Sequence, residues 1–297
     1  MQRVTKIGAT VAVALIALSS PALAQGGHTV ASGLPGLPRN IIPLNVIGLT
    51  DDQRLVRFNS LVPGLALSGV PISGLQGDVT LVGIDYRVQN GLLYGVGNAG
   101  GIYTVNPNSG TAVKVSQLSV ALSGTSFGVD FNPAANRLRV VSDTGQNLRH
   151  NIDDPSGAPP VNTTVADAAL TTPPAAGTTN GVTAAGYTNN DLAATTGTTL
   201  FDVNTTNDTL VVQSPANAGT LAAAGQLTVD AVGNAGLDIY STLRNGTTVD
   251  NRALATLQVG GGYALYEVNP LTGEATSLGS FPPGTSVVDI AIPLNQP

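Results

Sequence analysis

The sequence predicts an all-β protein, a β-propeller of five four-stranded blades. Three observations predict this fold. One hairpin sequence occurs twice, weaker copies of it recur about every 45 to 50 residues, and the last strand matches the strands that open earlier units. A repeat of that length with about four strands per unit is typical of a propeller, whereas a β-solenoid repeats over a shorter period.

The repeated hairpin reads IYTVNPNSGTAVKV at 102–115 and LYEVNPLTGEATSL at 265–278. Alternating β-branched and aromatic residues predict a strand on each side of the turn. The turn is Asn-Pro-x-x-Gly, in which proline presets the backbone, asparagine closes the turn through its side chain and glycine takes the left-handed conformation. Weaker copies are expected at 55–67, 147–161 and 200–213.

The strand before the hairpin repeats as well. It contains glycine, an aliphatic residue and aspartate at 83–85, 128–130 and 236–238. The unit at 184–197 departs from this pattern, and the C-terminal strand at 286–293 matches it through Asp289. The first unit has no opening strand and the last strand has no hairpin after it. We therefore expect the C-terminal strand to complete the first blade and close the ring, which removes two exposed sheet edges.

The predicted blades span 45–72 with 286–293, 80–118, 126–165, 181–213 and 226–279. Two segments between them, 154–180 and 214–225, have compositions that favour long loops between blades. The alternative is that these irregular segments hide a sixth blade.

The N-terminal segment predicts export. A basic start, a short apolar run at 7–18 and the small residues Ala-Leu-Ala at 22–24 are typical of a signal peptide. We expect residues 1–24 to be that peptide, cleaved after Ala24, residues 25–43 to be a flexible leader, and residues 44–297 to form a single propeller domain. An uncleaved anchor is the alternative, which the short apolar run disfavours. The mature chain would then be secreted or periplasmic, with no transmembrane segment.

Composition limits the chemistry. The chain has 297 residues, with 12 basic and 18 acidic side chains and no cysteine or tryptophan. The lack of cysteine excludes disulfides, thiolate nucleophiles and cysteine metal sites. An acidic chain that is poor in lysine is not expected to bind nucleic acid or an anionic membrane.

Three stretches resemble a known family. They are LVGIDYRVQNGLLYGVGNAGGIYTVNPNSGTA, GTSFGVDFNPAANRLRVVSDTGQNLR and LYEVNPLTGEATSLG. They are similar to the bacterial exported family catalogued as domain of unknown function 4394, and the resemblance extends from about residue 44 to the C-terminus. It implies a propeller-like fold and export. It implies no activity and no site residues.

The repeated aspartates are the first candidate site. The opening strand of each blade lines the central channel of a propeller, so Asp85, Asp130, Asp238 and Asp289 are expected near one axis. Calcium accepts six to eight oxygen ligands, which such a ring with water could supply. The alternative, which we favour, is that each aspartate caps backbone amides or pairs with an arginine at a blade junction.

A cluster of arginines is the second candidate site. Arg137, Arg139 and Arg149 stand close together in a chain with few basic residues. They could grip a carboxylate or sulfate on a ligand. The alternative, again favoured, is that they pair with Asp130 and Asp143 inside the propeller. His150 has no visible acid-base partner and is expected to be a surface or structural residue.

These observations favour an exported, non-catalytic propeller that serves as a binding protein or as an envelope or matrix scaffold. Its partner would be an extracellular polymer, a small molecule or a protein, and no cofactor is expected. The alternative is a calcium-dependent hydrolase or lactonase with the metal in the central channel.

Overall fold

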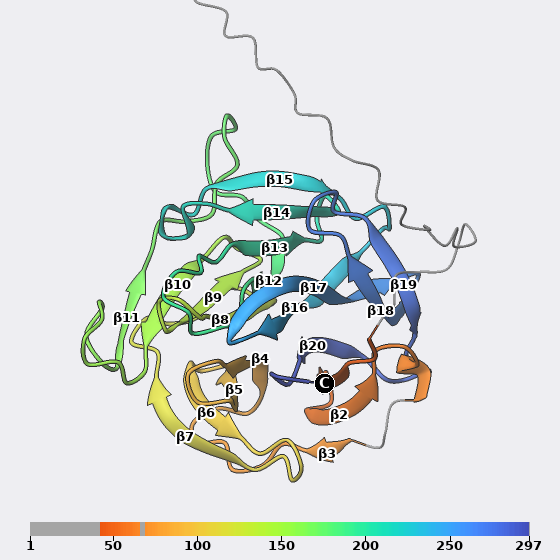
Figure 1. Cartoon of the computed structure of the whole chain (residues 1–297), viewed down its shortest axis with the longest axis horizontal. Coiled ribbons are helices and arrows are strands. Elements are labelled where there is room, and N and C mark those ends of the chain that lie inside the picture. The colour runs from red at the N-terminus through yellow and green to blue at the C-terminus, as the bar shows by residue number, and fades with distance from the viewer. Residues whose placement is uncertain (1–41, 66–68, 297) are drawn as a thin grey trace, which may run out of the picture. The chain divides into compact units, whose positions relative to one another are not determined.

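The computed structural model describes residues 42–65 and 69–296, which build a ring of antiparallel sheets (Figure 1). The predicted signal peptide lies outside the described residues, as does the predicted leader except for Ile42 and Pro43. The only helices among the described residues are two short 3-10 turns, η1 (Pro63–Leu65) and η2 (Ala216–Ala218). In this part of the chain no helix has the length and apolar character needed to span a bilayer.

Five sheets of four strands each form the blades, which confirms the predicted fold. From the inside outward, blade 1 consists of β20 (Val287–Ala291), β1 (Asn45–Thr50), β2 (Arg54–Asn59) and β3 (Val70–Pro71). Blade 2 consists of β4 (Leu81–Arg87), β5 (Leu92–Gly97), β6 (Gly101–Val105) and β7 (Ala112–Gln117). Blade 3 consists of β8 (Phe127–Asn132), β9 (Arg137–Ser142), β10 (Asn147–Asn151) and β11 (Thr163–Ala166).

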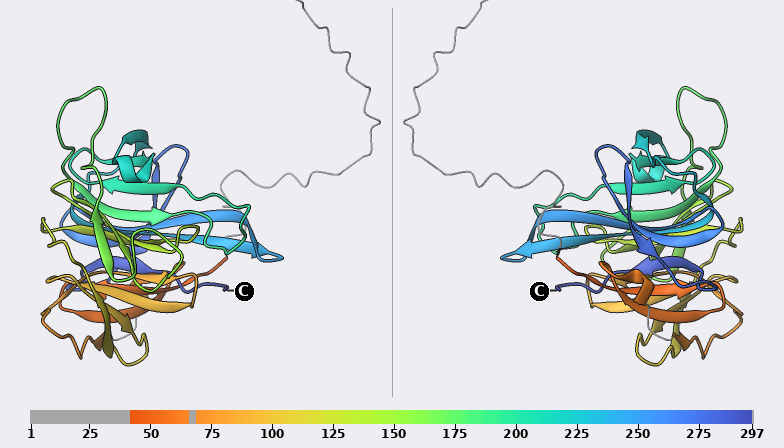
Figure 2. Two further views of the ribbon diagram at one scale, coloured as in Figure 1. Left: turned by 90° about the vertical axis from the view of Figure 1, so that its left-hand side faces the viewer. Right: turned by 90° about the vertical axis from the view of Figure 1, so that its right-hand side faces the viewer.

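The last two blades follow the same order. Blade 4 consists of β12 (Val182–Tyr187), β13 (Leu200–Asn204), β14 (Thr209–Gln213) and β15 (Leu221–Gln226). Blade 5 consists of β16 (Val232–Arg244), β17 (Thr247–Val259), β18 (Gly262–Val268) and β19 (Ala275–Ser280). The β16–β17 hairpin extends beyond the other blades, on the side of the ring where the C-terminal end lies (Figure 2).

The C-terminal strand closes the ring as expected. Strand β20 pairs with β1 in antiparallel register, with Ile47 opposite Ala291 and Leu49 opposite Asp289. The inner strand of blade 1 therefore comes from the far end of the described chain, and neither edge of that junction is left open.

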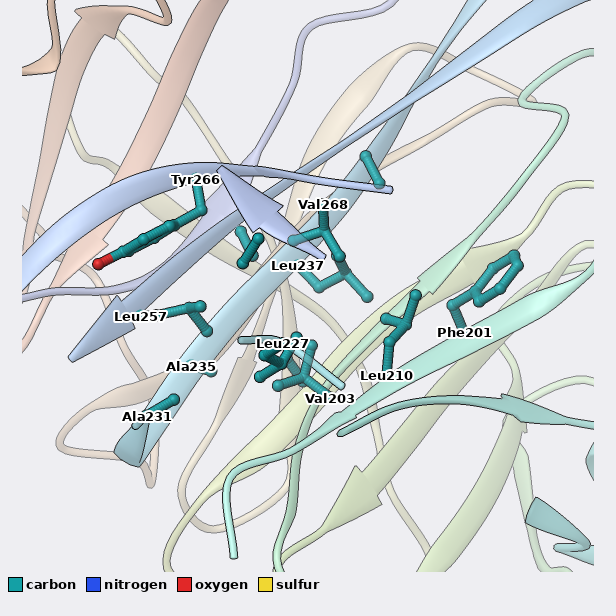
Figure 3. Packing of buried hydrophobic residues seen from close by; sticks show 14 of the residues in the cluster. Phe201, Val203, Leu210, Leu227, Ala231, Ala235, Leu237, Leu257, Tyr266 and Val268 are labelled. Carbon is teal, nitrogen blue, oxygen red and sulfur yellow. The ribbon is translucent and has the colours of Figure 1, made fainter. Parts of the chain in front are cut away.

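The hydrophobic core is divided into clusters that lie between neighbouring blades. The largest joins blades 4 and 5, where Phe201 and Leu210 approach Leu237 and Leu257 (Figure 3). Alternate residues of a strand point to opposite faces, so each blade contributes apolar side chains to two such clusters. Burial of this apolar surface, at about 25 cal/mol per Å², holds the blades together.

Each of the two copies of the repeated turn packs against the preceding blade. Gly110 and Gly273 have φ angles of 71° and 76°, the left-handed conformation that was predicted for them. Asn106 accepts hydrogen bonds from the turn amides through its side chain, as Asn269 does in the second copy. A Cβ on Gly110 would lie 2.1 Å from the carbonyl oxygen of Pro71 in blade 1. The turn therefore requires glycine for both its conformation and its contact.

Blade 4 differs from the prediction. The stretch 200–213 was expected to match the repeated hairpin, but it forms β13 and β14, the second and third strands of its blade. The outer strand is β15, which lies in a segment expected to be a loop. The error arose because the Asn-Thr-Thr-Asn turn at 204–207 resembles the repeated turn, and adjacent hairpins of one sheet share the same alternation. The segments expected to be loops contribute strands to blades 3 and 4, and the described residues form no sixth blade.

Candidate functional site

The four repeated aspartates lie on the innermost strands. Asp289 is on β20, Asp85 on β4, Asp130 on β8 and Asp238 on β16, and all four are buried. One carboxylate oxygen from each of Asp85, Asp130 and Asp238 lies within 4.8 Å of the other two. The repeat predicts that the aspartate side chains converge on one axis, and these three do.

Each of these carboxylates also binds a backbone amide of the next blade. Asp85 accepts a 2.8 Å hydrogen bond from the amide of Phe131, and Asp289 accepts a 2.7 Å bond from the amide of Ile84. Asp130 and Asp238 accept bonds of 3.3 and 2.5 Å from the amides of Tyr187 and Ile292. Each repeated aspartate therefore connects its own blade to the next one.

Blade 4 lacks its aspartate. Asp85 binds the amide after Asp130, and Asp130 binds the amide after Gly186, so Gly186 takes the aspartate position in β12. A Cβ at Gly186 would meet the side chains of Leu237 and Ile239 at 3.2 to 3.4 Å. Apolar side chains of blade 5 thus occupy the place next to the missing carboxylate.

Burial raises the pKa of these aspartates. The pKa values of Asp85 and Asp130 lie well above the ordinary 3.8, chiefly because of desolvation and then because of repulsion between the carboxylates. Desolvation raises the pKa of Asp238 to about 7, against the opposing effect of its amide hydrogen bonds. Burial and mutual repulsion therefore favour the protonated forms of these carboxylates. Calcium binding at these residues stays a prediction.

The three arginines of the second candidate site are paired with carboxylates. Arg137 contacts Asp154 at 3.0 Å. Arg139 contacts one oxygen of Asp167 at 2.8 Å, and Arg149 donates to both oxygens of the same carboxylate at 3.1 Å. These partners are not the ones suggested by the sequence. Asp130 binds the amide of the next blade and Asp143 binds Thr125.

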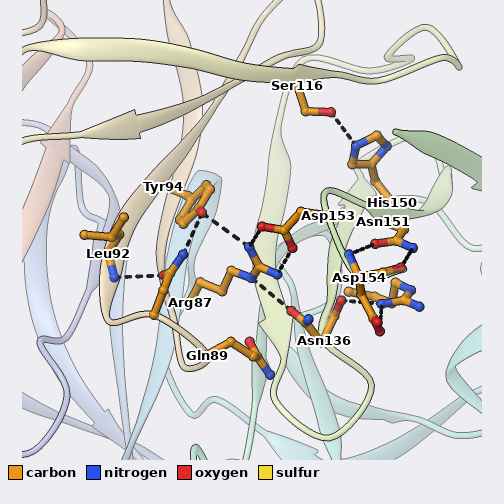
Figure 4. A network of polar contacts seen from close by, with 12 residues as sticks. Arg87, Gln89, Leu92, Tyr94, Ser116, Asn136, His150, Asn151, Asp153 and Asp154 are labelled. Atoms are coloured by element: carbon orange, nitrogen blue, oxygen red, sulfur yellow. Dashed lines mark hydrogen bonds and ion pairs between the residues drawn. The ribbon is translucent and has the colours of Figure 1, made fainter. Parts of the chain in front are cut away.

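A further arginine joins blades 2 and 3. Arg87, at the end of β4, reaches across to Asp153 and also contacts the hydroxyl of Tyr94 and the side chain of Asn136 (Figure 4). The adjacent acidic residues Asp153 and Asp154 thus each bind one arginine. The sequence draws attention to these arginines because basic residues are rare in the chain. Which carboxylates they pair with depends on how two blades pack together.

His150 is a structural residue. It is fully buried, and its ring nitrogens lie 2.8 Å from Ser116 Oγ and 2.9 Å from Thr164 Oγ1. The Ser116 hydroxyl donates to Asn162, so it accepts from His150 Nε2, and His150 Nδ1 accepts from Thr164. Burial lowers the pKa of His150 to about 4. In this arrangement the imidazole cannot take a proton from Ser116.

Asp202 was missed by the sequence reasoning. It lies on β13 within an apolar strand and is fully buried, and neither carboxylate oxygen has a hydrogen-bond partner among the described residues. Burial raises its pKa to about 8, although the charge of Arg139 opposes the shift. The only sign of this residue in the sequence is an acidic side chain within an otherwise apolar strand.

A pocket of about 570 Å³ opens on blade 1, where β1 begins and β2 ends. Its apolar walls are Val46, Ile47, Phe58, Val62, Leu65 and Pro293. Arg57 and Tyr86 also line it, together with three amide side chains. Gln296, one of those amides, bonds to the backbone of Asn45 in both directions and so fixes the C-terminal segment as one wall. No short sequence motif marks this pocket.

Comparisons with known proteins identify a family and add no activity. No curated protein matches the chain. A protein of unknown function from Bacteroides thetaiotaomicron is 14% identical, with a TM-score of 0.45; the match covers 84% of this chain and 64% of that one. The major allergen Mala s 1 of Malassezia sympodialis is 13% identical, with a TM-score of 0.39 over 79% of this chain and 75% of the allergen. The family model described as domain of unknown function (DUF4394) matches residues 54–291, and the chain belongs to that family.

Proposed function

We propose that this chain is an exported, non-catalytic binding propeller whose ligand site is the pocket on blade 1. The observation that carries the proposal is a contrast between the charged side chains of the ring and those of the pocket. The aspartates and arginines singled out from the sequence are engaged in bonds between or within blades. The pocket, by contrast, is lined by Arg57, which has no carboxylate partner among the described residues, and by Tyr86.

The lining of the pocket supports binding over catalysis. Its described residues include no carboxylate and no imidazole, the groups that most often act as general acids and bases. Two of the apolar side chains that line the pocket, Val62 and Leu65, are exposed. Exposed apolar surface that gathers at a pocket is typical of a binding site.

Export is supported by the signal-peptide pattern at residues 1–24. We propose that the mature chain, starting at Gln25, acts in the periplasm or outside the cell. Fractionation of cells that express the full chain, with N-terminal sequencing of the product, tests this. A cytoplasmic product that retains Met1 would contradict it.

A screen of the mature chain tests binding against catalysis. Neutral, cationic and anionic small molecules are screened by thermal shift, and esters and lactones are assayed for hydrolysis with calcium and with EDTA. We expect at least one class of compound to raise the melting temperature, and this rise to be lost in Val62→Trp, which fills the pocket from an exposed position. We expect no hydrolysis and no calcium-dependent rise in melting temperature. Turnover that is lost in an Asp85→Asn, Asp130→Asn variant would establish the calcium-dependent hydrolase instead.

A further inference from the structure

We propose that the pocket on blade 1 binds a small organic acid, one carboxylate on an apolar body, with Arg57 and Tyr86 as its anchors. This inference rests on the proposed binding function and goes beyond it by naming the ligand class and the residues that select it.

Arg57 is the cationic group of the pocket. Its side chain donates to the amide oxygen of Asn108, and it has no carboxylate partner among the described residues. Five other arginines do have such partners: Arg87, Arg137, Arg139, Arg149 and Arg252. A guanidinium presents five donors in a planar fork that matches a carboxylate. Arg57 therefore keeps donors and a positive charge available to a ligand.

Tyr86 supplies a second donor. Its hydroxyl makes no hydrogen bond with the described residues, although the side chain lines the pocket. Tyr86 and Arg57 line the same pocket. Desolvation raises the pKa of Tyr86, and the charge of Arg57 acts in the opposite direction. The phenol therefore stays protonated at neutral pH and can donate. A guanidinium and a neutral hydroxyl together suit one carboxylate.

The rest of the ligand must be apolar. Six apolar residues, including the aromatic Phe58, line the pocket around these two donors. The volume of about 570 Å³ lies within the range that holds a drug-sized molecule. Of the three amide side chains, Gln296 is bonded to the backbone of Asn45, and the side-chain oxygen of Asn59 accepts from the amide of Leu61. One cationic side chain also favours a monoanion over a dianion.

The test is isothermal titration of the mature chain with matched probes. Phenylbutyrate and decanoate are compared with the corresponding alcohols and amines, which keep the apolar body and lose or reverse the charge. We expect the acids to bind at least about tenfold more tightly than the alcohols, the scale of one charge-assisted hydrogen bond. The amines should bind more weakly still.

Variants locate the anchor. We expect Arg57→Gln to weaken binding of the acids about tenfold or more, and Tyr86→Phe to weaken it by a smaller factor. Arg244→Gln is the control, because Arg244 is exposed at the end of β16 and does not line the pocket. Circular dichroism and melting temperature establish that each variant is folded.

The outcomes separate the two proposals. If the alcohols bind as tightly as the acids and Val62→Trp abolishes both, the pocket binds ligands but the inference about carboxylates is wrong. The same conclusion holds if acids bind equally well to Arg57→Gln and to the unaltered chain. If the full screen finds no compound whose binding is lost in Val62→Trp, the pocket is not the ligand site, and the proposed function fails with the inference.

Discussion

Arg139 between blades 3 and 4 and Arg57 in blade 1 are the same residue type in opposite situations. The Arg139 side chain is 3% exposed and donates to Asp167, Asn147, Asn217 and Tyr187. Arg57 is partly exposed and donates to one amide oxygen. A buried guanidinium must have its donors satisfied, whereas one at the edge of a pocket can exchange water for a ligand. The role of an arginine here follows from its surroundings and not from local sequence.

The largest expected effect is on stability when Arg139 is removed. Arg139→Met leaves the acceptors of a buried network without their donor, and we expect unfolding in urea to require about 3 to 5 kcal/mol less free energy. Arg57→Gln is the matched variant, and we expect it to change that free energy by less than about 0.5 kcal/mol. Equal losses in the two variants would mean that Arg57 also has a structural role.

The second effect is a pH dependence from Asp202. Its pKa is about 8 in the folded state against an ordinary value of 3.8, so between these values the folded chain holds a proton that the unfolded chain has lost. The contribution to stability is complete below about pH 4 and is lost progressively as the pH rises to 8. We therefore expect Asp202→Asn to become more stable than the unaltered chain as the pH rises through this window.

Unfolding free energies measured from pH 4 to 8 for both chains check this expectation. The difference between the two chains isolates Asp202 from the channel aspartates, which titrate in both. A difference that does not vary with pH would mean that Asp202 is ionised inside the fold, with its charge balanced by Arg139.

The smallest expected effect concerns Asp85. It tests whether this side chain is needed as the acceptor that connects two blades or as a carboxylate, the group that a metal site would require. Asp85→Ala removes the acceptor of the buried Phe131 amide, and we expect a loss of about 1 to 3 kcal/mol in the free energy of unfolding. Asp85→Asn keeps an amide oxygen for that bond and also removes a repelling carboxylate, so we expect a smaller loss or none. Denaturant unfolding in EDTA measures both variants. If Asp85→Asn is as destabilising as Asp85→Ala, the carboxylate itself is required.

The fold was predictable from sequence because its signals are local. The Asn-Pro-x-x-Gly turns and the alternating strands report on neighbouring residues, and the match between Asp289 and the other inner aspartates identified the closing strand. Blade 4 was misread because two successive hairpins of one sheet look alike without the pairing that distinguishes them.

The sites were less predictable because they depend on packing. The convergence of Asp85, Asp130 and Asp238 followed from the repeat, since equivalent positions of a ring meet at its axis. The true partners of Arg137, Arg139 and Arg149 could not be read from the chain, because loops of variable length carry Asp154 and Asp167 to them. Arg57 and Tyr86 belong to different blades, so no spacing in the sequence connects them.

The closing strand has a consequence for how the molecule folds. The amide of Asn45 donates to the side chain of Gln296 across 251 residues, and β1 pairs with β20 over a similar separation. Contacts between such distant parts of a chain form slowly, because a long loop must close before any of its bonds contribute. We therefore expect blade 1 to be completed after the other blades, whose strands are close together in sequence, and its pocket to form only when β20 has joined β1. Appearance of the pocket during refolding would report ring closure directly.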